Sequence, residues 1–269
     1  MATIEAQDLR RMMGRFRVLI MGRANAGKTT ILQKVCNTTD QPEIYDTKGN
    51  KVRVMIYAIH ASIADLSRRG NHDITNEMVF TSNSTFVFHD SCGFEAGSEE
   101  EFEDMKKFIS DRAHATKLED RIHAIWYCIP MDEHCRTFQR SEEKFFQECD
   151  TGHVPVVAVF TKFEALRPVA YGDIKKQLLG VSREERSKRI AERVEELFSR
   201  TGVLDRLYSP ENRARPKSHV RLQNVNQQNT NCDTLLESTT LALDNEELRL
   251  CLVSTQKSNL ELCIKCAIV

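Results

Sequence analysis

The sequence has no excess of charge of either sign. Lysine and arginine total 38, aspartate and glutamate total 39, and the formal net charge is -1 at pH 7. Neither end of the chain carries a basic arm. Proteins that hold nucleic acid or anionic lipid through a broad basic surface need such an excess. We therefore expect no nucleic-acid partner.

Long hydrophobic runs are also missing. No apolar stretch reaches the roughly 20 residues that a membrane-spanning helix needs. The first residues carry no hydrophobic segment of a signal peptide. Nine cysteines are scattered at irregular spacings, an odd number that does not indicate a disulfide framework. We expect a cytoplasmic protein with reduced thiols.

What is present is the composition of a soluble globular protein. The 269 residues are 41% hydrophobic and 29% charged, without an internal repeat. One sizeable core is possible at this length, so we expect a single domain over residues 1–269.

Segments of strand and helix character alternate along the chain. Continuous or alternating apolar residues predict strands at residues 16–21, 51–59, 85–89, 122–129, 154–160 and 248–253. Helical spacing and capping residues predict helices at residues 28–36, 98–109, 141–149 and 182–198, and a last helix from Asn259. Residues 209–233 are polar and are predicted to form a surface loop or a disordered segment. This order predicts an α/β fold with a mostly parallel sheet covered by helices on both faces.

A glycine-rich loop separates the first strand from the first helix. Its eight residues fit the phosphate-loop pattern G-x-x-x-x-G-K-[ST]: Gly22-Arg23-Ala24-Asn25-Ala26-Gly27-Lys28-Thr29. The glycines let the backbone approach phosphate oxygens, and the helix adds its positive dipole end. Lys28 places an ammonium between the β- and γ-phosphates, and Thr29 offers a hydroxyl to Mg²⁺. The predicted nucleotide contacts here are Asn25, Ala26, Gly27, Lys28, Thr29 and Thr30.

Two further motifs follow predicted strands. In Asp90-Ser91-Cys92-Gly93, the aspartate can hold Mg²⁺ through water, and the Gly93 N–H can touch the γ-phosphate. In Thr161-Lys162-Phe163-Glu164, the carboxylate can accept N1–H and N2–H₂ of guanine, which adenine does not offer, while the Lys162 stem lies along the base.

The order of these motifs resembles that of P-loop GTPases of the TRAFAC class. The phosphate loop is most similar to the Era/TrmE/septin-like branch, and the resemblance implies a GTP/GDP-binding domain with Mg²⁺. It implies a first-switch threonine, for which Thr47 is favoured over Thr38 and Thr39, as a second Mg²⁺ ligand beside Thr29. The family's last motif would be Ser254 and Thr255, after the last predicted strand. In parts of this branch the loop asparagine, here Asn25, contributes to a K⁺ site.

The chain departs from the family at two positions. Glu164 replaces the usual aspartate, which keeps the charge and adds one methylene. Phe94 stands where Ras-like switches have a water-orienting glutamine, so we expect slow hydrolysis with Lys28, Thr47 and Gly93 as the catalytic contacts. Arg23 could act as an arginine finger, but we interpret it as a solvated loop residue.

Two regions lie outside these motifs. Residues 165–249 exceed what one connection needs and form either a surface insertion or an arm that binds a homodimer partner or an effector protein. The chain ends Cys266-Ala267-Ile268-Val269, a prenylation pattern, but these residues continue the apolar face of the predicted last helix, so we expect no lipid anchor.

Three functions remain open. The first is a nucleotide-dependent switch that hydrolyses GTP slowly to GDP. The second is a GTP-binding assembly module with negligible hydrolysis. The third is an ATP-using kinase, with Arg183, Arg186 and Arg189 as lid arginines, although a kinase would not need the Thr161–Glu164 motif.

Overall fold

A largely apolar segment, Phe16–Gly22, forms the central strand of a seven-stranded sheet. The computed structural model describes residues 14–52, 73–91, 99–133 and 138–255. The strands lie in the order β2-β3-β4-β1-β5-β6-β7. Their bounds are β1 (Phe16–Gly22), β2 (Glu43–Tyr45), β3 (Glu77–Phe80), β4 (Asn83–Asp90), β5 (Ala124–Pro130), β6 (Val156–Thr161) and β7 (Ser218–Arg221).

Five neighbouring strands of this sheet run parallel. β1 pairs with β4 and β5, β5 with β6, and β6 with β7, all in parallel, whereas β2 and β3 form an antiparallel edge beside β4. Ile20 lies opposite Asp90 across the first of these pairs. Parallel strands place all their carboxyl ends at one edge, so the predicted motifs after β1, β4 and β6 emerge on the same side of the sheet.

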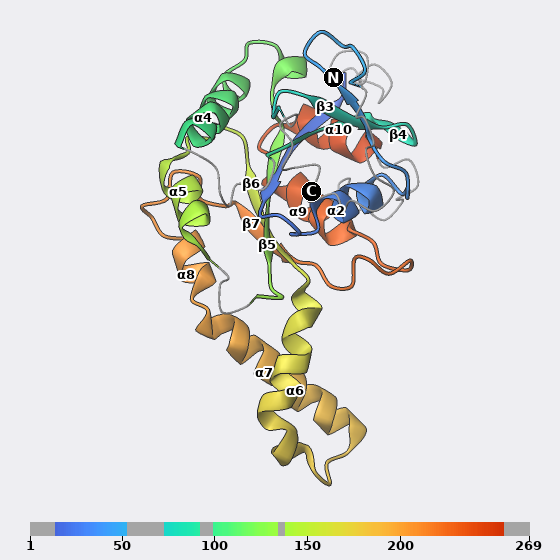
Figure 1. Cartoon of the computed structure of the whole chain (residues 1–269), viewed down its shortest axis with the longest axis vertical. Helices are drawn as coiled ribbons and strands as arrows, with labels where there is room; N and C mark the ends of the chain where they lie inside the picture. The colour runs from blue at the N-terminus through green and yellow to red at the C-terminus, as the bar shows by residue number, and fades with distance from the viewer. Residues whose placement is uncertain (1–13, 53–72, 92–98, 134–137, 256–269) are drawn as a thin grey trace.

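Helices cover both faces of the sheet (Figure 1). They are α2 (Lys28–Val35), α4 (Glu99–Ala113), α5 (Arg140–Glu148), α6 (Leu166–Ile174), α7 (Arg183–Arg200), α8 (Val203–Leu207), α9 (Asp233–Ala242) and α10 (Glu246–Thr255), with short 3₁₀ turns η1 (Leu118–Asp120), η3 (Phe163–Ala165) and η4 (Lys175–Leu178). The predicted α/β fold with a mostly parallel sheet is therefore confirmed.

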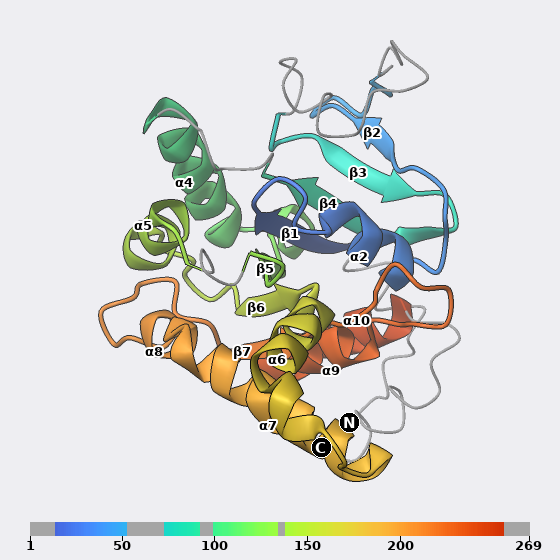
Figure 2. The same ribbon diagram turned by 60° about the horizontal axis from the view of Figure 1, so that its bottom comes forward.

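Alternate residues of each strand build two separate cores. Val18 and Ile20 face α2, α9 and α10, where the Trp126 indole donates a hydrogen bond to the Thr239 hydroxyl at 3.0 Å. Leu19 and Met21 face α4 and α5 with a cluster of aromatic rings. Figure 2 shows these two helical layers on opposite sides of the strands. A strand buried on both faces has no polar alternation, which is why the largely apolar segments of β1, β5 and β6 were predictable as strands.

The predicted last strand was wrong. Residues 248–253 belong to helix α10, which buries Cys251 and Leu252. Among the described residues the last strand is β7, inside the segment predicted to be a polar loop. β7 has four residues, of which only Val220 is buried. Such a short edge strand lacks a readable period, and a short apolar run does not distinguish helix from strand. The predicted strand at 51–59 and the last helix from Asn259 lie largely or wholly outside the described residues.

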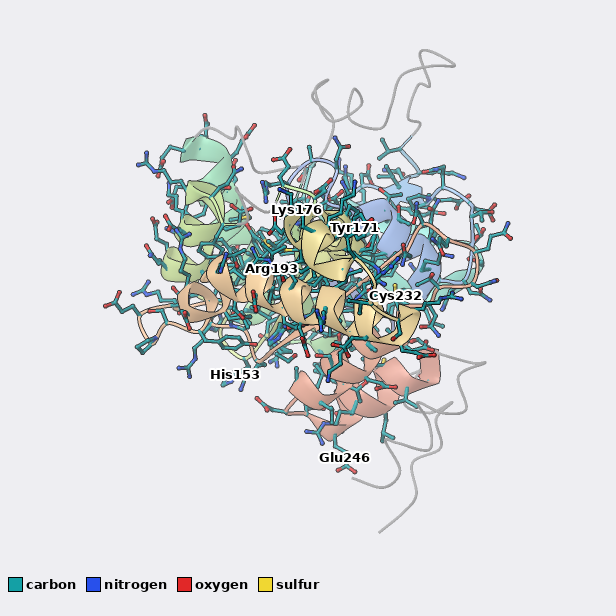
Figure 3. The ribbon with its side chains drawn as sticks, turned by 90° about the horizontal axis from the view of Figure 1, so that it is seen from below. His153, Tyr171, Lys176, Arg193, Cys232 and Glu246 are labelled. Carbon is teal, nitrogen blue, oxygen red and sulfur yellow. The ribbon has the colours of Figure 1, made fainter. Side chains whose placement is uncertain are left out.

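The helices between β6 and β7 form an arm that projects from the sheet (Figure 1). α6, η4 and α7 enclose a small apolar cluster of Ala170, Leu178 and Ile190. Ser182 caps α7 by accepting a hydrogen bond from the Glu185 N–H, as predicted. Figure 3 looks onto the arm from below and labels Tyr171, Lys176 and Arg193 on it. Because β7 and α9 also fall within residues 165–249, that range is not one insertion, and the projecting part is α6 to α7.

Candidate functional site

The loop between β1 and α2 has the conformation that its glycines permit. Gly22 has φ of 128°, and a Cβ atom there would lie 2.3 Å from the Cys128 carbonyl oxygen. Gly27 has φ of 81° and precedes α2 directly. Asn25 adopts a left-handed φ of 58°, a conformation that asparagine tolerates. The K⁺ role of Asn25 stays a prediction.

The first turn of α2 points toward this loop. The first helical hydrogen bond runs from the Ile31 N–H to the Gly27 carbonyl at 3.0 Å. The N–H groups of the residues before Ile31 have no helical partner, as at any helix start. The predicted contacts Asn25, Ala26, Gly27, Thr29 and Thr30 thus lie in one short loop and turn suited to an anion.

Lys28 and Asp90 meet beside the loop. The Lys28 ammonium donates to the carbonyls of Gly22 at 2.8 Å and Arg23 at 3.1 Å. It lies 3.7 Å from Asp90 Oδ1, too long for a hydrogen bond but within ion-pair range. Asp90 Oδ1 and the Ser91 hydroxyl are buried without hydrogen-bond partners in the described part of the chain. Unsatisfied oxygens suit Mg²⁺, a cation that prefers oxygen ligands. Gly93 and Phe94 lie outside the described residues.

Arg23 is not a solvated loop residue. It is 4% exposed, and its Nε lies 3.0 Å from Oε1 of Glu142, which is 0% exposed in the first turn of α5. This contact is an ion pair without hydrogen-bond geometry, because neither atom has a hydrogen-bond partner. The other oxygen of Glu142 accepts from the Gln139 N–H at 2.9 Å. The pair ties the phosphate loop to α5 and leaves no exposed guanidinium to act as an arginine finger.

The predicted base-reading residues lie at the end of β6 and contact the loop after β7. Glu164 Oε2 accepts from the Asn224 N–H at 2.9 Å. Lys162 has φ of 52°, and its ammonium lies 2.6 Å from Asp132. The Thr161 hydroxyl is buried without a hydrogen-bond partner among the described residues. One carboxylate oxygen of Glu164 is thus held by the backbone, and the other is available to a ligand.

Ser254 and Thr255 do not belong to this site. The Thr255 carbonyl accepts from the Asn83 side chain at 3.2 Å, and Asn83 begins β4, whereas Asp90 ends it. Strand geometry separates the two ends of β4 by about 23 Å. The error follows from the mistaken last strand. The loop at Asn224, after β7, is the segment that contacts Glu164.

Thr47 lies in an exposed turn after β2. Asp46 Oδ1 accepts from the N–H groups of Lys48 at 2.9 Å and Asn50 at 2.8 Å, so the sequence forms an aspartate-centred turn. β2 is the outer edge strand, separated from β4 by β3. The structure does not bring Thr47 to the phosphate loop, and its role stays a prediction.

Thr75 is a second candidate for the first-switch threonine that would bind Mg²⁺, and the sequence alone did not indicate it. It lies just before β3, and the carbonyl of the preceding Ile74 is 3.0 Å from Nδ1 of His89, the neighbour of Asp90. Burial lowers the pKa of His89 to about 4, so a neutral ring donates this hydrogen bond. Thr75 is therefore fastened close to the strand that carries Asp90. β3 has only four residues, too few to show an alternation of apolar and polar residues, so the threonine that precedes it could not be located from the sequence.

The cysteines and acidic groups of the described residues form no further catalytic or metal site. Five cysteines among the described residues are buried free thiols, and burial raises the pKa of Cys128 to about 12. No three His, Cys, Asp or Glu side chains converge as a metal site within residues 14–52, 73–91, 99–133 and 138–255. In that same portion of the chain, every helix is too short or too polar to cross a bilayer.

Comparison with known proteins finds a similar solved structure. No family model matches the chain, and no curated protein matches it. It is similar to the crystal structure of a variant of the Aquifex aeolicus protein Era bound to GDP·AlF4⁻, with 16% sequence identity and a TM-score of 0.42. The match covers 85% of this chain and 57% of that one, so the chain spans little more than half the length of Era. The sheet order and the loop between β1 and α2 place this chain in the α/β P-loop NTPase fold.

Proposed function

We propose that this chain binds GTP with Mg²⁺ and hydrolyses GTP slowly to GDP and phosphate, as a nucleotide-dependent switch. One observation carries the proposal. Lys28, Asp90 and Glu164 follow or end three parallel strands of one sheet, at the same edge. This arrangement supports recognition of phosphate, metal and base side by side at one edge of the sheet.

The phosphate end relies on Lys28 and the loop N–H groups. Lys28 now donates to two loop carbonyls and would turn the same ammonium to phosphate oxygens. Thr29 and Asp90, with Thr47 or Thr75, would hold Mg²⁺, which neutralises charge on the phosphates. Gly93 would contact the γ-phosphate through its N–H. Loss of the γ-phosphate on hydrolysis would then release the adjoining loops.

The base end relies on Glu164. Its carboxylate, oriented by the Asn224 N–H, would accept both donors of guanine. Lys162, held by Asp132, would place its stem along the base. Thr161 contributes a buried hydroxyl next to them. Adenine offers no pair of donors to a carboxylate, so ATP would leave Glu164 unpaired at a cost in affinity.

Hydrolysis would be slow because neither of two candidate catalytic groups, Phe94 and Arg23, suits the task. Phe94 cannot orient or deprotonate water, and Arg23 is buried against Glu142. A homodimer partner, an effector protein or K⁺ near Asn25 would supply the missing stabilisation. The kinase alternative loses support because Arg189 pairs with Glu185 at 2.8 Å and Arg186 donates to the Leu178 carbonyl, both within the arm.

Phosphate release under multiple turnover separates a switch from an assembly module. With GTP and Mg²⁺ in excess, we expect turnover on the order of 10⁻⁴ to 10⁻² s⁻¹, the range of P-loop GTPases without an activator. Lys28→Ala supplies the background. If the protein binds GTP tightly but releases phosphate no faster than Lys28→Ala, the assembly module is favoured and the enzyme assignment is removed.

A further inference from the structure

A pocket of about 560 Å³ opens at the edge of the sheet opposite the phosphate loop. It is lined where β6 and β7 begin, by Val156, Lys217 and the residues before them. β1 and β6 are parallel to β5, so the phosphate loop lies beyond their other ends. Its volume falls within the usual range of small-ligand sites, roughly 300–1,000 Å³.

The lining is rich in positive charge. It includes Arg213, Arg215 and Lys217, with His153 beside them, against one acid, Asp244. Figure 3 shows His153 on the outer surface of the molecule. Lys217 lies 3.5 Å from Asp244, but both side chains are more than half exposed, so the pair contributes little.

Arg213 and Arg215 lack ionic partners. Within the described segments of the chain, neither forms an ion pair. Arginines of the arm behave differently, since Arg189 pairs with Glu185 and Arg193 with Asp173. In a chain of nearly zero net charge, such a cluster is a local feature and not a consequence of composition.

The backbone anchors the segment that carries these cations. The Ala214 N–H donates to the Phe146 carbonyl and the Lys217 N–H to the Val156 carbonyl, both at 2.9 Å. Ala214 and Pro216 are buried, whereas Arg213, Arg215 and Lys217 are exposed and line the pocket. Three cations at one pocket suit a ligand with several phosphates better than a single anion.

The geometry points to a second anion site at this pocket, for a ligand that carries several phosphate groups, separate from the nucleotide site. The ligand would be a soluble polyphosphorylated molecule or the phosphorylated headgroup of a lipid. Arg213 and Arg215 would bind phosphates through their guanidinium forks, and Lys217 would add a third contact. The inference does not require the proposed function, because it uses none of its residues.

Titration calorimetry with inositol hexakisphosphate, in excess GDP and Mg²⁺, tests this site. We expect saturable binding that Arg213→Glu with Arg215→Glu weakens about tenfold or more. Arg183→Glu with Arg200→Glu makes the same charge change at exposed positions of α7 and is expected to leave binding unchanged. If the double glutamate variant does not fold, Arg213→Gln with Arg215→Gln replaces it in the same titration.

Vesicles of phosphatidylcholine, with or without a phosphoinositide bisphosphate, identify the source of the phosphates. A higher affinity for the phosphoinositide vesicles than for inositol hexakisphosphate assigns a lipid headgroup as the ligand. Binding of inositol hexakisphosphate without binding to the vesicles assigns a soluble molecule. The proposal is overturned by no binding to either probe, by equal weakening in the α7 control, or by displacement of the probe with GTP.

Discussion

Lys28→Ala is expected to weaken guanine nucleotide binding about 10- to 100-fold. Each hydrogen bond to a charged group contributes about 1.5–3 kcal/mol, and tenfold in affinity is about 1.4 kcal/mol. The Lys28 ammonium is 3.7 Å from Asp90 and points into the phosphate loop. Equilibrium titration with a fluorescent GDP analogue measures the change.

Lys107→Ala is the matched control for this variant. Lys107 is an exposed lysine of α4, so its loss removes the same charge without touching the loop. We expect an unchanged dissociation constant. An equal loss in both variants would mean that general charge, and not the phosphate loop, holds the nucleotide.

Glu142→Ala is expected to destabilise the fold by about 3–5 kcal/mol. The substitution leaves the buried Arg23 guanidinium with only the exposed carboxylate of Glu133, 3.9 Å away, as a counter-charge, and removing one partner of a buried ion pair is costly. It also removes the acceptor for the Gln139 N–H at the start of α5. Urea unfolding is the measurement, with a midpoint lower by about 1–3 M.

Two variants separate this effect from loss of any glutamate in α5. Glu143→Ala removes a partly exposed acid next in sequence and is expected to cost about 1 kcal/mol or less. Arg23→Met with Glu142→Leu replaces both charges and should recover much of the stability. A Glu142→Ala midpoint equal to that of Glu143→Ala would show that the pair is not a structural anchor.

The parts of the fold that were predictable have strong local signals. β1, β5 and β6 are largely apolar runs, and the phosphate loop is a fixed spacing of residue types between a strand and a helix. β7 has one buried residue in four, so its segment was predicted to be a loop. α10 has a short apolar run, so its segment was predicted to be the last strand. Local pattern does not reveal which strand completes a sheet, because pairing joins distant segments.

In the candidate site, too, some residues follow from sequence motifs and others only from tertiary contacts. The positions of Lys28 and Asp90 follow from motifs, but their companions come from tertiary contacts. Glu142 meets Arg23 from a helix on another part of the chain, and Asn224 reaches Glu164 only because β7 pairs with β6. Thr75 likewise lies near Asp90 through the contact of Ile74 with His89. No spacing in the sequence encodes these neighbours.

The central claim is that this chain binds guanine nucleotide in preference to adenine. Titration of the purified protein with a fluorescent GTP analogue in Mg²⁺, with unlabelled ATP as competitor, tests it most directly. We expect saturable binding that unlabelled GTP displaces and ATP at equal concentration does not, since only guanine pairs with the Glu164 carboxylate. Displacement by ATP at equal concentration would contradict the assignment of Glu164, and no binding at all would contradict the nucleotide site itself.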